Sequence, residues 1–430
     1  MSAVGVAMHG LVTELYPICR SITGNGVRQT LEILRRRLPL QVHEVPSGTA
    51  VFDWTVPREW NIRDAYVKAA DGRRVIDFRA SNLHVLNYSV PVRARMTLAE
   101  LKPHLFTRPD LPDVIPYKTS YYKEAWGFCL RHRDLEELGE GEYDVLIDAS
   151  LEAGSLTYGE YYLPGESDDE VLLSCHVCHP SLANDNLSAV AVAVSLAQAL
   201  ASRPSRRYSY RILFIPGTIG SITWLARNED SVSRVKHGLV LAGLGAGEGF
   251  TYKKSRRGDA PIDRAVQHVL AHVKQPFAIA SFSPYGYDER QFCSPGFNLP
   301  VGCLMRTPHG QYREYHTSAD DPGFVAPATL AESLETCLRV VDVLERDERY
   351  LNLSPKCEPQ LGRRGLYRTL GGEMDAAGRE MAMLWVLNQS DGGPTLLDIA
   401  ERAGLPFHAI AAAAETLTSH GLLKPVTDLA

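Results

Sequence analysis

The sequence has no continuous apolar stretch of the roughly 18 residues that a membrane-spanning helix requires. Its first residues, MSAVGVAMHGLVTELYPICRSITG, lack a basic segment followed by an apolar core. We therefore expect an amphipathic helix there and no secretion signal. Positive charge is not in excess either, because the formal net charge is −6 and the pI is near 6.2. These absences argue against a membrane partner and against nucleic-acid binding by the whole chain.

Cysteine is sparse and scattered. Eight cysteines are spread over more than 300 residues, from Cys19 to Cys357. A disulfide-stabilised secreted protein is usually shorter and has a denser set of cysteines. We therefore expect reduced thiols and a cytoplasmic location.

Several common catalytic motifs are absent. The chain has no GxSxG motif, no HExxH motif and no phosphate-binding P-loop. The segment GAGEG at residues 245–249 lacks the GxGxxG spacing of a dinucleotide-binding turn. The chemistry of this protein must therefore be sought in another pattern.

The length of 430 residues predicts two or three domains. We assign residues 1–50 to N-terminal helices, 51–150 to a β-rich insertion domain with Asp-Gly and Pro turns, and 151–360 to an α/β domain. We assign residues 375–430 to a winged helix-turn-helix domain. Its expected elements are three helices over 380–389, 390–406 and 407–420, with a turn at Gly404 and a short strand after the last helix.

Strand and helix patterns alternate between residues 158 and 349. EVLLSCHV and YSYRILFIP are typical of buried strands, whereas LSAVAVAVSLAQALAS is typical of a helix rich in small residues. This alternation predicts an α/β fold with a mostly parallel sheet. Ligand sites in such sheets form where the strands end.

The densest chemical signal is SCHVCHPSLANDNLS, residues 174–188, between a predicted strand and a predicted helix. It holds His176, Cys178, His179 and Asp185. Zinc prefers imidazole, thiolate and carboxylate ligands, and a catalytic zinc leaves one position open for water. Each residue alone also fits a structural role, and both histidines with two cysteines would suit a structural zinc site. Together, at a strand end, they favour a metal centre.

Two further clusters lie later in the chain. YGYDERQF, residues 285–292, holds Asp288 and Glu289, and YREYHTSADD, residues 312–321, holds Glu314 and His316. A histidine and carboxylates in loops can complete a metal shell and supply a base. Taken alone, Asp288 and Glu289 also fit solvated loop charges.

These motifs together resemble the zinc aminopeptidase fold of bacterial leucyl aminopeptidases and glutamate carboxypeptidase. More narrowly, CHPSLANDNLS, FIPGTIGS, YGYDERQFCSPGFNLPVG and YHTSADD are similar to an uncharacterised bacterial branch that adds a β-rich insertion and a C-terminal winged helix. The resemblance covers nearly the whole chain and implies that Asp185 and His316 are metal ligands. His179 is the next candidate, and His176, which lies where the wider fold has its strand-end histidine, competes with it.

The sequence departs from that fold at two places. The wider fold has a Glu-Glu pair after the strand matching YRILFIP, but residues 216–220 read PGTIG. A further aspartate ligand is missing from residues 243–247. The departures predict one zinc ion rather than two, with a base supplied by Glu289, Asp288 or Glu314, in that order of preference.

The candidate substrate-binding residues are Tyr287 and Arg290, in the second cluster, and Arg256. Arg256 belongs to a basic run, residues 253–257, which fits either a solvated surface or a clamp for an anionic substrate group.

The expected activity is hydrolysis of a peptide or amide bond in a small substrate, by an enzyme of the metallo-aminopeptidase or amidohydrolase type. Two alternatives are a winged-helix DNA-binding regulator with a degenerate hydrolase domain and a zinc-stabilised binding protein without catalysis. The segment FHAIAAAAETLTSHGLL, which would enter a DNA groove, is poor in Arg and Lys and argues against the regulator. A homo-oligomer is possible.

Overall fold

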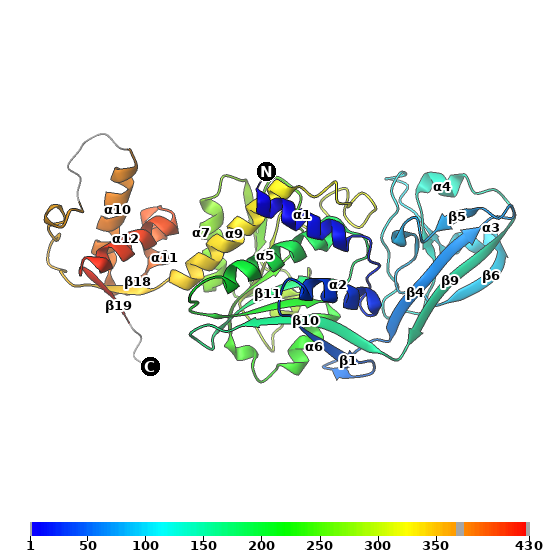
Figure 1. The fold of residues 1–430 in the computed structure, drawn as a ribbon, viewed down its shortest axis with the longest axis horizontal. Helices are drawn as coiled ribbons and strands as arrows, with labels where there is room; N and C mark the ends of the chain where they lie inside the picture. The colour runs from blue at the N-terminus through cyan, green and yellow to red at the C-terminus, as the bar shows by residue number, and fades with distance from the viewer. Residues whose placement is uncertain (1, 367–373, 427–430) are drawn as a thin grey trace. The chain divides into compact units, whose positions relative to one another are not determined.

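A computed structural model describes residues 2–366 and 374–426 of the chain. The chain divides into two compact units, residues 1–260 with 276–335 and residues 261–275 with 336–430 (Figure 1). Of the predicted winged-helix range 375–430, the last four residues lie outside the described part. No helix among the described residues is both long and apolar enough to cross a membrane.

An eight-stranded mixed sheet forms the centre of the first unit, in the order β1-β10-β12-β11-β13-β16-β14-β15. β11 pairs in parallel with β12 and β13, and every residue of β11 is buried. The strands are β1 (Gln41–Pro46), β10 (Ser155–Leu163), β11 (Glu170–His176), β12 (Ser209–Ile215), β13 (Val235–Leu241), β14 (Phe250–Lys253), β15 (Phe277–Ala280) and β16 (Val301–Met305). The predicted α/β class with a mixed, mostly parallel sheet is confirmed.

Residues 1–50 were predicted to be helical, but one part of this range is a strand. Gln41–Pro46 form the edge strand β1, which pairs antiparallel with β10. The segment ends in Pro46, and Val45 is fully buried. Because β-branched side chains favour strands and proline interrupts helices, this segment continues the sheet rather than the preceding helix.

Helices flank the central sheet. α5 consists mainly of Ala, Val and Leu, so it packs closely on the strands, and Figure 1 shows α5 and α6 on opposite sides of them. The helices are α1 (Ala3–Leu15), α2 (Asn25–Arg35), η3 (Ala183–Ser188), α5 (Ala189–Ala201), α6 (Ile219–Arg227), η4 (Val232–Arg234), α8 (Glu289–Phe292) and α9 (Pro327–Arg346). β11 leads through a loop and η3 directly into α5.

The β-rich region holds an antiparallel sheet in the order β5-β4-β9-β6. Its long strand β9 alternates exposed and buried residues over much of its length, as expected for a sheet with one covered face. The strands are β2 (Ala50–Val51), β3 (Trp54–Thr55), β4 (Glu59–Lys68), β5 (Arg74–Asp77), β6 (Val92–Thr97), β7 (Leu105–Phe106), β8 (Phe128–Cys129) and β9 (Glu142–Glu152). Short helices are η1 (Asn82–His84), α3 (Leu98–Leu101), η2 (Lys102–His104) and α4 (His132–Glu136).

The second unit contains a winged helix-turn-helix fold. Its elements are α7 (Pro261–Ala271), β17 (Arg349–Asn352), η5 (Gly362–Arg364), α10 (Met374–Gln389), β18 (Asp391–Thr395), α11 (Leu396–Ala403), α12 (Phe407–Ser419) and β19 (Leu423–Pro425). The helix expected over 390–406 is shorter than predicted, because Gly392 and Pro394 disfavour a helix and residues 391–395 form β18. Thr395 and Asp398 form a capping box at the start of α11, and Gly404 ends that helix with a φ of 63°.

Candidate metal centre

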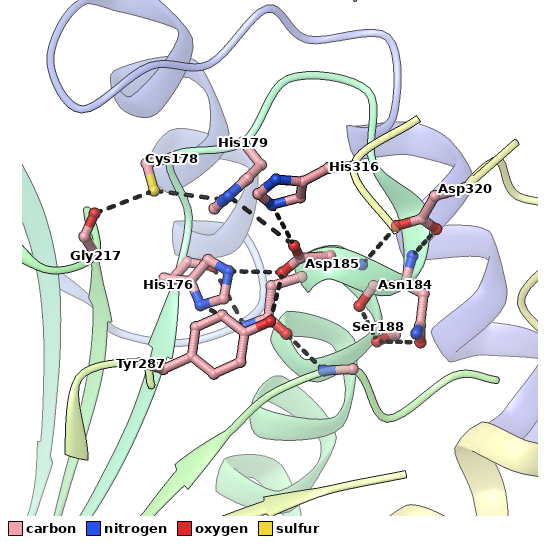
Figure 2. A network of polar contacts seen from close by, with 12 residues as sticks. His176, Cys178, His179, Asn184, Asp185, Ser188, Gly217, Tyr287, His316 and Asp320 are labelled. Atoms are coloured by element: carbon pink, nitrogen blue, oxygen red, sulfur yellow. Dashed lines mark hydrogen bonds and ion pairs between the residues drawn. The ribbon is translucent and has the colours of Figure 1, made fainter. Parts of the chain in front are cut away.

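The centre of the site is Asp185, which lies in η3 between β11 and α5. Asp185 is fully buried. His176, the last residue of β11, places its Nε2 2.9 Å from Asp185 Oδ1. His316 comes from a loop 131 positions later and places its Nε2 3.0 Å from Asp185 Oδ2 (Figure 2). His179 Nε2 lies 4.0 Å from the same oxygen. The fold thus brings the three predicted histidine ligands to the fourth predicted ligand, the Asp185 carboxylate.

The polar atoms of this cluster fit a cation. Although Asp185 Oδ2 and His316 Nε2 are 3.0 Å apart, both are buried and neither makes a hydrogen bond. Ligand atoms of His176, His179 and Asp185 all lie within 4.8 Å of one another. Two imidazoles and a carboxylate are a ligand set that zinc prefers, and His316 adds a third imidazole. The unsatisfied pair is what a shared cation between the two atoms would satisfy.

Charge in the cluster also suits a cation. Burial raises the pKa of Asp185, but the imidazoles of His179, His176 and His316 outweigh this effect and leave the pKa well below its ordinary value. Burial holds the pKa of His179 well below its ordinary value. Asp185 is therefore ionised and His179 neutral near pH 7, which are the protonation states that metal binding requires.

Cys178 contacts His179 from the side away from Asp185. Its Sγ lies 3.5 Å from His179 Nδ1 and donates to the Gly217 carbonyl at 3.7 Å (Figure 2). With the thiol proton directed at Gly217, Nδ1 carries the ring proton, and Nε2 offers its lone pair towards Asp185. Cys178 therefore orients His179 and is not a ligand of this cluster.

Asp320 holds the loop that carries Asp185, a role that we did not predict from the sequence. The Asp320 carboxylate accepts hydrogen bonds from the backbone N–H groups of Asn184 at 2.6 Å and Asp185 at 2.9 Å. Burial raises its pKa to about 7. Its place four residues after His316, in YHTSADD, was the only available signal.

The loop after β13, where the wider fold would have another aspartate, has a different use here. Asn186 Oδ1 accepts from Gly243 N at 3.0 Å, and Asn184 Oδ1 accepts from Gly245 N at 2.9 Å. The side-chain oxygens of the two asparagines that flank Asp185 are therefore committed to backbone groups. This loop supports η3 and supplies no carboxylate.

Asp288 brings a carboxylate to the position of the missing Glu-Glu pair. A Cβ built on Gly217 would lie 3.5 Å from both Asp288 oxygens and 3.2 Å from the Cβ of His176. Ser221 Oγ donates to Asp288 Oδ1 at 2.8 Å, whereas Oδ2 has no hydrogen-bond partner. Burial raises the pKa of Asp288 to about 6.

The other two predicted bases are placed differently. Glu289 is buried, and its Oε1 lies 2.7 Å from Nζ of the buried Lys253. Glu314 is half-buried, and its backbone carbonyl accepts from Thr317. Glu289 is therefore neutralised by a cation, and no described contact joins Glu314 to the cluster.

The structure places the three predicted substrate-binding residues differently. Tyr287 stacks on His176 with ring centroids 4.8 Å apart, and its hydroxyl donates to Asp185 Oδ1 at 3.5 Å. Arg290 is half-buried, with no hydrogen-bond partner for its Nε. The exposed Arg256 donates instead to Asn298 Oδ1 at 3.0 Å. The structure brings Tyr287 to the cluster but gives Arg256 a contact elsewhere.

Two aromatic residues near the site were not predicted. The ring centroid of Tyr117, from the β-rich region, lies 5.1 Å from that of His179 and 5.0 Å from that of His316. Its backbone N–H donates to the His316 carbonyl at 2.8 Å. His309 packs against Tyr287, with ring centroids 4.9 Å apart. His309 lies in no recognisable motif, and Tyr117 begins the tyrosine-rich segment YKTSYYKEAW, residues 117–126, whose composition indicates core or interface packing rather than a site.

The first unit has an aminopeptidase-like fold, and the chain has a winged helix-turn-helix in addition. It superposes on a zinc aminopeptidase of Bacillus subtilis with a TM-score of 0.57 at 12% identity, covering 79% of this chain and 94% of the other. It also superposes on a Shewanella amazonensis M28 peptidase precursor with a TM-score of 0.53 at 12% identity, covering 80% and 93%. At such low identities these likenesses concern the fold alone.

Family models define the family of this chain more narrowly than the fold does. Residues 9–347 match the family described as Domain of unknown function (DUF4910), and residues 348–425 match a winged helix-turn-helix family. The chain therefore belongs to the DUF4910 family. A Clostridium acetobutylicum relative, provisionally named a polysaccharide biosynthesis protein with an aminopeptidase-like domain, is 55% identical over 99% of this chain and 98% of its own. A crystal structure from that organism, provisionally called a peptidase, has a TM-score of 0.94 at 53% identity, covering 98% and 96%.

Proposed function

We propose that this protein is a zinc-dependent hydrolase of peptide or amide bonds in small molecules, of the metallo-aminopeptidase or amidohydrolase class. The observation that carries the proposal is the convergence of three imidazoles on the buried Asp185 carboxylate, with Asp185 Oδ2 and His316 Nε2 left without hydrogen bonds. The aminopeptidase-like fold supports it.

Asp185, His316, His179 and His176 would hold the metal. Bound zinc lowers the pKa of a water molecule and polarises a substrate carbonyl. We propose one ion rather than two, because residues 216–220 and 243–247 supply no further carboxylate. The side-chain oxygens of Asn184 and Asn186, which flank Asp185, already accept backbone N–H groups.

Asp288 is the base that we favour over Glu289 and Glu314. Ser221 orients its carboxylate, its Oδ2 is free to accept a proton, and a pKa near 6 suits a base that works near neutral pH. Glu289 is a weaker candidate because Lys253 already neutralises it. Asp288 would take the proton of the attacking water and pass it to the leaving nitrogen, while Tyr287 and Arg290 would contact the substrate.

The name of the Clostridium relative suggests a place in polysaccharide biosynthesis, which we carry over as part of the proposal. The described cysteines are all free, which suits a cytoplasmic enzyme. DNA binding is not favoured, because α12 contains neither Lys nor Arg and exposes Glu415. We infer that the winged helix serves for docking or self-association.

Metal analysis with matched variants tests the proposal. The purified protein is expected to hold about one zinc per chain, and Asp185→Ala and His316→Ala to lose it, while Asp321→Ala, which removes an exposed carboxylate from the same segment, retains it. In a screen of aminoacyl and acyl amides, Asp288→Asn should keep the zinc and lose about 10²–10⁴-fold in rate. A normal zinc content in Asp185→Ala and His316→Ala would refute the ligand assignment. Full turnover by Asp288→Asn would leave Glu289 or Glu314 as the base.

A further inference from the structure

We infer that the acyl group cleaved at this site has no free amino group beside the scissile bond, so that N-acylated, capped amides are the substrates and free amino-acid amides are not. The inference rests on the proposed metal-dependent hydrolysis at Asp185 and names the substrate class of that site. Of the two proposed enzyme classes it selects the amidohydrolase, because an aminopeptidase acts beside a free amino group. It follows from where the carboxylates and cations of the site lie.

A substrate ammonium group at a buried site needs a carboxylate that is not already engaged, because an unpaired buried charge is costly. Asp185 Oδ1 contacts His176, and Oδ2 faces His316 and would be taken up by the proposed zinc ion. Asp185 is also the only carboxylate in the proposed ligand set, so one zinc ion with this carboxylate leaves a centre of net charge about +1. Such a centre repels a neighbouring ammonium group.

The other buried carboxylates do not supply the missing negative charge. Lys253 Nζ lies 2.7 Å from Glu289 Oε1, and both residues are almost fully buried, so the pair is neutral as a unit. Glu289 Oε2 has no hydrogen-bond partner, but its charge is already matched by Lys253. Asp288 accepts from Ser221 and is the proposed base, so its remaining oxygen serves the attacking water.

Asp320 is also buried beside the cluster, but its two carboxylate oxygens accept the backbone N–H groups of Asn184 and Asp185. The other groups around the cluster are neutral or cationic. Tyr117, Tyr287 and His309 provide aromatic rings. Arg290 adds a cation whose Nε has no hydrogen-bond partner. A Cβ on Gly217 would already approach the His176 Cβ to 3.2 Å, so this strand end has little space for a carboxylate of its own. These surroundings accept a neutral acylamino group and oppose an ammonium group.

A pair of chromogenic substrates tests the inference on the zinc-loaded, full-length protein. Leucine p-nitroanilide carries the free amine, and N-acetyl-leucine p-nitroanilide differs only by the cap. We expect kcat/KM to be at least about tenfold higher for the capped substrate. Calorimetry with leucine and N-acetyl-leucine gives a readout independent of turnover, and the capped ligand should bind more tightly by a similar factor.

Two lysine variants test whether the Lys253–Glu289 pair causes the preference for the capped substrate. Lys253→Met leaves Glu289 without its counter-charge and should shift the preference about tenfold towards the free amine. Lys254→Met removes the same charge from the next residue, which is half-buried, and should leave the preference unchanged. If Lys253→Met does not fold, the wild-type comparison still decides.

Three results would overturn the inference: equal rates or affinities for the free and the capped compound, a preference for the compound with the free amine, or no binding of either ligand. If the wild-type protein binds zinc and hydrolyses amides but prefers the free amine, the inference alone fails. If it binds no zinc, the proposed function fails with it.

Discussion

Replacing Tyr117 tests whether the β-rich region helps to build the metal centre. Tyr117 is 8% exposed, its ring contacts those of His179 and His316, and its hydroxyl lies 2.9 Å from that of Tyr121. Truncating a buried aromatic ring to alanine costs about 3–5 kcal/mol of stability, whereas losing one hydroxyl contact costs about 1 kcal/mol. Residues that orient metal ligands typically contribute about 10–100-fold to metal affinity.

We therefore expect Tyr117→Ala to weaken zinc binding by about 10–100-fold and Tyr117→Phe to retain most of the affinity. Zinc titration against a competing chelator measures the affinity, and the absorption spectrum of the cobalt-substituted protein reports the ligand geometry. Thermal unfolding of each metal-free variant shows how much stability the substitution removes. Wild-type zinc affinity and an unchanged cobalt spectrum in folded Tyr117→Ala would show that Tyr117 does not orient the histidines, as would equal losses in the alanine and phenylalanine variants.

Two further predictions concern Cys178 and His268. Cys178→Ala removes the contact with His179 Nδ1 and should weaken zinc binding about tenfold. The control is Cys175→Ala, which should not weaken zinc binding, because the Cys175 thiol donates to the Leu213 carbonyl. Equal chelator-competition curves for the two variants would contradict the orienting role of Cys178. Burial lowers the pKa of His268 to about 4, and its Nε2 accepts the Phe407 N–H at the start of α12. Since the unfolded state binds the proton more readily, this contribution to stability is complete above about pH 6.5 and is lost as the pH falls towards 4. His268→Gln should therefore show a smaller fall in melting temperature over that pH range than the wild type, and identical pH profiles would count against it.

The sequence predicts the fold and the four candidate ligands because their signals are local. A strand that ends in His176, a loop with Asp185 and a small-residue helix follow one another within about 30 residues. His316 is distant in sequence but carries its own short motif. The chemistry of zinc then suggests that these residue types belong together.

The remaining features of the site depend on tertiary contacts that no local pattern encodes. Asp288 fills the space beside Gly217 from a segment 71 residues later, and Lys253 neutralises Glu289 across 36 residues. Tyr117 comes from the β-rich region, whose sequence shows only short strands and turns. Sequence spacing identified the carboxylates at 288 and 289, but only their neighbours distinguish a candidate base from half of an ion pair.

Anomalous diffraction from crystals of the zinc-loaded protein, recorded on both sides of the zinc absorption edge, is the sharpest test of the proposed metal site. We expect one strong peak, within bonding distance of Asp185 and His316 and of His179 or His176. A map without a peak among these residues, while they keep the positions described above, would show that they do not bind zinc.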